Sequence, residues 1–99
     1  MLQRTDNNAS LAGDLTVDET PELYRKSLAW QSSSMPVSID LTELNKTDSS
    51  AVALLLEWSN WARQQNQNIE FLNPPDNLRT IAALSQVDTL LGWTSEEER

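Results

Sequence analysis

The sequence contains no cysteine and no histidine. These two absences exclude thiol catalysis, a Ser-His-Asp triad, and any metal site that uses cysteine or histidine ligands. A metal site made of carboxylates alone remains possible on composition, but the acidic residues are scattered along the chain. We therefore expect neither a metal ion nor a cofactor.

Glycine is scarce as well, with only Gly13 and Gly92 in the chain. A phosphate-binding loop and a dinucleotide-binding turn each need several glycines at fixed spacing, so neither motif can be assembled. The acidic run Glu96, Glu97 and Glu98 is typical of a solvated tail rather than of paired catalytic carboxylates. We expect a protein that is not an enzyme and has no small-molecule substrate.

Basic residues are few: 7 against 15 acidic ones, for a formal net charge of -8. This balance provides no basic surface for nucleic acid and would be repelled by an anionic membrane. The longest apolar run, 51–56, is too short to cross a bilayer, and the first ten residues contain no signal-peptide core. We expect a cytoplasmic protein whose association with a membrane is made through a partner.

The spacing of apolar residues predicts alternating strands and helices within one domain spanning 1–99. Residues 1–9 either fray or form a weak edge strand, and we expect both 1–9 and 94–99 to be flexible. Strands are predicted at 10–15, 37–41 and 69–72, helices at 16–31, 49–65 and 76–85, and a short last turn at 87–93. The predicted fold class is α/β, a small mixed sheet with helices packed mainly on one face.

The chain has four tryptophans. Trp58 falls on the apolar face of the helix predicted at 49–65, and we expect it in the core. Trp30, Trp61 and Trp93 fit their patterns less well. For these three, core packing and exposure at a partner interface both remain open.

Polar residues stand directly before the most hydrophobic helix, whose apolar face begins at Ala51. Asp48 and Ser49 are both favoured N-cap residues. Either side chain could accept a hydrogen bond from a free backbone N–H of the first helical turn, which stabilises a helix by about 1 kcal/mol.

Capping accounts for only one residue of the cluster Thr47, Asp48, Ser49 and Ser50. It also leaves the apolar character of Val52 and Leu56 unexplained. They lie one turn apart beside the main apolar stripe, where a surface helix is normally polar. The alternative is a docking surface, in which an exposed hydroxyl cluster adjoins a small apolar stripe. The residues alone do not decide between capping and docking.

The segment IDLTELNKTDSSAVALLL resembles the centre of STAS domains, the fold of bacterial anti-sigma factor antagonists. In that family a strand ending near Asp-Leu leads through a loop to Asp-Ser-Ser/Thr-Gly and an apolar helix. The family's functional hydroxyl, the first after the aspartate, matches Ser49. Gly13, Asp14 and Leu15 match a Gly-Glu-Leu-Asp segment of the family.

Two positions depart from the pattern. Thr16 stands in place of the family's aspartate, and Ala51 stands in place of the glycine of the phosphorylation switch. We expect the Ala51 side chain to crowd the helix tip, which argues against a switch of that kind.

The later segments ALLLEW and ARQQNQNIEFLNPPDNLRTIAALSQVDTLL are similar to those of the MlaB branch of the family, and the likeness covers 10–93. These are small subunits of the phospholipid ABC transporter that maintains outer-membrane lipid asymmetry. The resemblance implies a non-catalytic subunit that binds and supports the transporter's ATPase subunit, in the cytoplasm and peripheral to the inner membrane. Ser49 matches a functional threonine there, so the hydroxyl is kept and the methyl is lost.

A second function stays open beside this one: an anti-sigma-factor-antagonist-type partner switch controlled by phosphorylation of Ser49. Both functions place the partner-binding or regulatory site on Thr47, Asp48, Ser49, Ser50, Val52 and Leu56.

Overall fold

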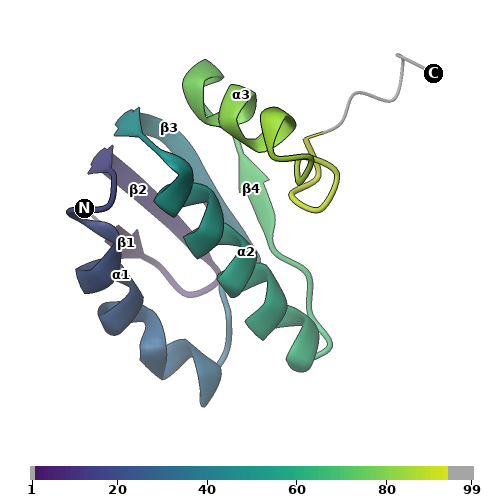
Figure 1. Ribbon diagram of the computed structural model, residues 1–99. Coiled ribbons are helices and arrows are strands. Elements are labelled where there is room, and N and C mark those ends of the chain that lie inside the picture. Colours follow the sequence, from purple (N-terminus) through teal and green to yellow (C-terminus); the bar gives the residue numbers. More distant parts are fainter. Residues whose placement is uncertain (1, 94–99) are drawn as a thin grey trace.

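Within the residues that the computed structural model describes, 2–93, a four-stranded mixed sheet forms one layer, and three α-helices cover one of its faces (Figure 1). The strands lie in the order β1 (Leu2–Arg4), β2 (Asn8–Leu15), β3 (Ser38–Thr47) and β4 (Glu70–Leu72). β1 is antiparallel to β2, whereas β2, β3 and β4 are parallel. The predicted fold class is confirmed.

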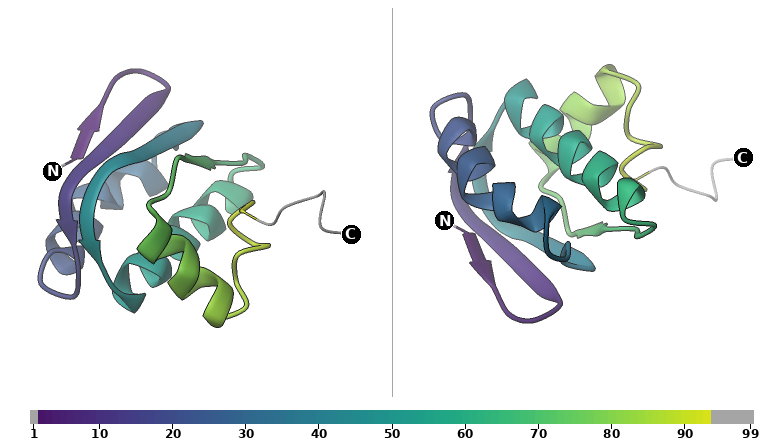
Figure 2. Two further views of the ribbon diagram at one scale, coloured as in Figure 1. Left: turned by 90° about the horizontal axis from the view of Figure 1, so that it is seen from above. Right: turned by 90° about the horizontal axis from the view of Figure 1, so that it is seen from below.

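The helices are α1 (Thr20–Ser27), continued by the 3-10 turn η1 (Leu28–Gln31), α2 (Ser49–Gln64) and α3 (Asp76–Leu84). α2 packs between α1 and α3, as the views in Figure 2 show. Each of β2, β3 and β4 is followed by one helix. All three helices therefore begin at the edge of the sheet where the parallel strands end.

The first helix was predicted to begin at residue 16, but α1 begins at Thr20. Residues 16–19 form a turn instead, because the Glu19 carboxylate accepts hydrogen bonds from the backbone N–H of Thr16 at 2.8 Å and from its hydroxyl at 2.7 Å. Pro21 lies in the first turn, where its missing N–H costs no helical hydrogen bond. The predicted end at residue 31 is reached by η1 rather than by an α-helix.

β3 is longer than the strand predicted at 37–41. Its polar second half pairs with the end of β2, with Gly13 opposite Leu44 and Leu15 opposite Thr47. This pairing shifts register twice along β2, and Gly13, at φ +91°, takes a left-handed conformation that suits glycine. The shifts break the simple period of two, so the sequence pattern alone did not indicate the extension.

All four tryptophans are buried, between 0% and 8% exposed, which settles the open alternative in favour of core packing. The Trp58 ring lies 5.2 Å from that of Trp30, and its indole N–H donates to the Ser27 hydroxyl at 2.9 Å. The Trp93 indole N–H donates to the carbonyl of Phe71 at 3.0 Å and so covers part of the outer edge of β4.

β1 fulfils the edge-strand alternative for the N-terminal residues: it pairs with β2, and Arg4 adds contacts outside the sheet. Arg4 donates to the carbonyl of Ser34 at 2.9 Å, and its guanidinium lies 5.3 Å from the centre of the Trp30 ring. The residues predicted as a solvated tail, 94–99, lie outside the described residues. Within 2–93, none of the helices has the length and apolar content that a membrane span requires.

The buried Ser27–Trp58 hydrogen bond provides a test of the core. Ser27→Ala leaves the indole N–H of Trp58 without its partner in a site with no exposure, which should lower the free energy of unfolding by about 1–3 kcal/mol. Urea unfolding followed by circular dichroism measures this change. Ser33→Ala, at an exposed serine, is the matched control and should stay within about 0.5 kcal/mol of wild type. An equal loss of unfolding free energy in the two variants would show that the Ser27–Trp58 hydrogen bond does not stabilise the core.

Candidate functional site at the tip of α2

The polar cluster of the sequence forms the tip of α2, and a single residue connects it to the sheet. β3 ends at Thr47, Asp48 is extended (φ −141°, ψ −169°), and α2 begins at Ser49. The short connection fixes the first turn of α2 at the edge where the parallel strands end. This edge is a frequent site of recognition in α/β folds, because helix N-termini and loops gather there.

Asp48 is the N-cap of α2. Its Oδ1 accepts from the backbone N–H of Ser50 at 2.9 Å and also from the Ser50 hydroxyl. Its Oδ2 accepts from the backbone N–H of Val17, in the loop between β2 and α1, at 3.0 Å. The carboxylate therefore joins two segments that are 31 residues apart in sequence.

These hydrogen bonds favour the ionised form of Asp48. The Ser50 hydroxyl makes the largest contribution, and together with the backbone donors it holds the pKa of Asp48 below its usual value. The pKa of Glu19 is also lowered, chiefly by the Thr16 hydroxyl, although the charge of Asp48 opposes this in part. Two carboxylates are thus ionised beside the N-terminus of α2 at neutral pH.

Ser49 is the hydroxyl that capping does not use. It is the first residue of α2 and is exposed, and within residues 2–93 its side chain has no hydrogen-bond partner. Ser50 donates to Asp48, and the hydroxyl oxygen of Thr47 is buried without a partner in the described part of the chain. The two alternatives for this stretch therefore fall on different residues, with Asp48 as the cap and Ser49 open to a partner.

The structure corrects the apolar part of the predicted surface. Val52 is only 5% exposed and belongs to the core, and Leu56 is partly buried and packs against that core. α2 is covered by α1 and α3 as well as by the sheet, so its buried face is wider than a single stripe. The expectation of an exposed apolar stripe at these positions is wrong for Val52.

The expectation for Ala51 is also wrong. Ala51 has no exposed surface, so its methyl group lies in the core and does not crowd the approach to Ser49. The alanine therefore gives no steric argument against a phosphorylation switch.

Other apolar residues are exposed near the tip of α2, and the sequence pattern did not indicate them. Val17 is 63% exposed, and its backbone is held to the tip by Asp48. Tyr24 is 40% exposed and lines a groove between α1 and α2 that reaches Ser50. An apolar residue in the polar stretch TVDET was a visible signal, but its position beside Ser49 depends on a contact across 31 residues.

Within residues 2–93 there is no group of three or more Asp, Glu, His or Cys side chains that could hold a metal ion. The chemistry that the tip offers is hydrogen bonding and charge: one open hydroxyl, two ionised carboxylates and neighbouring apolar surface.

Comparison with known proteins gives two findings. The family model described as "Mlab, STAS domain" matches residues 1–92. Among solved structures, the chain is similar to "Structure of the Anti-Sigma Factor Antagonist SpoIIAA in its Unphosphorylated Form", with a TM-score of 0.73 and 22% identity over 99% of this chain and 90% of that one. At this identity the likeness shows the shared fold. No curated protein matches the sequence.

The lowered pKa of Asp48 predicts how acid affects stability. A carboxyl whose pKa is depressed on folding stabilises the protein above its unfolded pKa, and this contribution is lost as pH falls through the folded value. Asp48→Asn keeps an N-cap side chain but removes the charge. We expect the variant to unfold at lower urea concentration than wild type at pH 7. This difference in unfolding midpoint should disappear below about pH 4. A gap that persists unchanged at pH 2 would show that the charge is not the cause.

Proposed function

Because the chain belongs to the STAS family described as Mlab, STAS domain, we propose that it is a non-catalytic accessory subunit of a phospholipid-transporting ABC transporter. In this proposal it binds the ATPase subunit and supports its assembly and activity. It is cytoplasmic and reaches the inner membrane only through that partner. STAS domains are protein-interaction modules, and the proposal assigns the interaction to the tip of α2.

The observation that carries the proposal is the position of Ser49. Its hydroxyl is exposed and unused, while Asp48 takes over the capping that would otherwise occupy it. A partner can therefore hydrogen-bond to Ser49 without disturbing the start of α2. Val17 adds exposed apolar surface beside it, and burial of such surface contributes most of the free energy of association.

The charge of the chain supports a basic partner surface. The net charge is -8, and Asp48 and Glu19 lie beside the proposed contact. Complementary charge raises the rate of association and disfavours acidic partners. Binding to the ATPase subunit should accordingly weaken as salt concentration rises.

We expect Ser49→Ala to weaken binding to the purified ATPase subunit by about tenfold, the effect of losing one hydrogen bond of about 1.4 kcal/mol at an interface. Isothermal titration calorimetry measures the dissociation constant. Unfolding in urea should be unchanged within about 0.5 kcal/mol, because Ser49 makes no side-chain contact within residues 2–93.

Ser49→Thr keeps the hydroxyl and restores the methyl of the family's threonine, so it should bind at least as well as wild type. Ser33→Ala, at an exposed serine outside the site, should bind like wild type. Normal binding by Ser49→Ala would show that the hydroxyl has no part in docking.

A second candidate function is a partner switch controlled by phosphorylation of Ser49. Two observations favour it: the fold shared with the anti-sigma factor antagonist, and the exposure of Ser49 at the positive end of a helix, which attracts phosphate. Intact mass after incubation with an anti-sigma-factor kinase separates the two functions. An added phosphate that is lost in Ser49→Ala, together with failure to bind the ATPase subunit, would favour the switch.

A further inference from the structure

A shallow groove runs between α1 and α2 and begins beside the tip. Its lining residues are Thr20, Pro21, Tyr24, Ser50, Ala53, Leu54 and Glu57. Ser50 stands at one end and Glu57 at the other, and the surface between them is mostly apolar. The two ends are seven positions apart along α2, which corresponds to about 10 Å at the rise of an α-helix.

The buried contacts between the helices set the shape of this groove. Below it, Trp58 of α2 is hydrogen-bonded to Ser27 of α1 at 2.9 Å, which fixes how closely the helices approach. Tyr24 of α1 and the small residue Ala53 of α2 both line the groove. The groove is therefore built on rigid elements.

Glu57 is held in position at its end of the groove. It is partly buried, and its carboxylate accepts from the indole N–H of Trp61 at 3.0 Å. The Trp61 ring is in turn packed against Tyr24, with ring centres 5.6 Å apart. The indole fixes the direction of the carboxylate, but a neutral donor leaves its negative charge in place.

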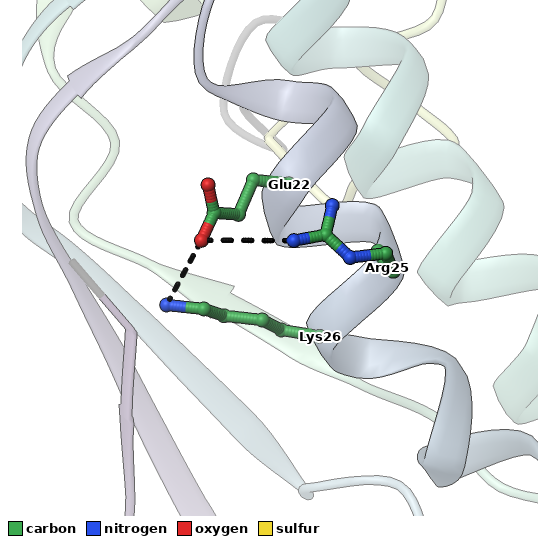
Figure 3. A network of polar contacts seen from close by, with 3 residues as sticks. All are labelled: Glu22, Arg25 and Lys26. Carbon is green, nitrogen blue, oxygen red and sulfur yellow. Dashed lines mark ion pairs between the residues drawn. The ribbon is translucent and has the colours of Figure 1, made fainter.

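The nearest cations of α1 do not neutralise this charge. Arg25 and Lys26 both pair with Glu22, at 3.8 and 3.6 Å (Figure 3). The lining of the groove contains no basic residue, and in the described part of the chain Glu57 forms no ion pair. A fixed carboxylate at the end of an apolar groove thus has no cationic partner within residues 2–93.

We propose that this groove receives one turn of a basic amphipathic helix of the ATPase subunit. An apolar side chain of that helix packs between Tyr24 and Ala53, and a lysine or arginine one turn away pairs with Glu57. Charge complementarity with Glu57 and the apolar lining favour an occupant that is both basic and apolar, and Ser50 makes the groove continuous with the contact proposed at Ser49. The inference rests on the proposed function and extends it from the tip to a second contact of stated chemistry.

The charge is tested with Glu57→Gln, which keeps an oxygen that can accept from Trp61 and removes the negative charge. Binding to the purified ATPase subunit should weaken by about tenfold at low salt, with less dependence on salt than wild type. Glu70→Gln is the matched control, because Glu70 is exposed on β4 outside the groove and carries the same charge. It should stay within about twofold of wild type.

The apolar part is tested with Ala53→Arg, which fills the groove from an exposed position and so should fold normally. It should weaken binding by more than tenfold, and Ala83→Arg, at an exposed alanine of α3, should not. Circular dichroism checks the fold of each variant.

The outcomes separate the two proposals. If wild type binds, Ser49→Ala binds more weakly, and Glu57→Gln and Ala53→Arg bind like their controls, the groove is not the second contact and the proposed function stands. If wild type does not bind the ATPase subunit, the proposed function is overturned and the inference falls with it. Weaker binding by both groove variants, with normal binding by both controls, supports the groove.

Discussion

The carboxylate of Asp48 is the interaction on which the candidate functional site depends. One oxygen closes the first turn of α2 through Ser50, and the other holds the β2–α1 loop through Val17. Without it the helix would lose its cap and the loop would lose its attachment to the tip. Because one acidic residue performs both tasks, the neighbouring Ser49 needs no structural role, and its hydroxyl remains open to solvent.

A second set of contacts depends on the aromatic residues between α1 and α2. Trp58 reaches Ser27 inside the core, and Trp61 contacts Tyr24 nearer the surface while donating to Glu57. Trp61, one of the aromatic residues packed between the two helices, therefore also directs the carboxylate at the end of the groove. Packing and the proposed recognition are linked here, because a change in the aromatic contacts would move Glu57 as well.

The sequence predicts the parts of this fold that follow from local periodicity. The apolar positions of β3 and α2 indicated the strand, the helix and the burial of Trp58 correctly. The second half of β3 was missed because its pairing with β2 shifts register at Gly13, a feature of two strands together. The start of α1 was misplaced because Glu19 uses its side chain to close a turn with Thr16.

The site was predictable to a similar degree. Asp48 as a cap follows from residue type and position, and Ser49 follows from its place after the aspartate in the family pattern. Val52 was misassigned, because the width of the buried face of α2 depends on how α1 and α3 pack around it. Val17 could not be placed at all, since the hydrogen bond that brings it to the tip spans 31 residues.

The charges around Ser49 separate the two functions considered for it. A phosphate there would gain from the positive end of α2, but it would also meet the ionised carboxylates of Asp48 and Glu19. A basic group from a partner would be attracted by both carboxylates. Since Glu57 adds a further negative charge along the same helix, the surface from Ser49 to Glu57 favours a basic partner throughout its length. The two functions therefore make different demands on one atom, the Ser49 oxygen: docking uses it as a free hydroxyl, whereas the switch requires it to accept a phosphate.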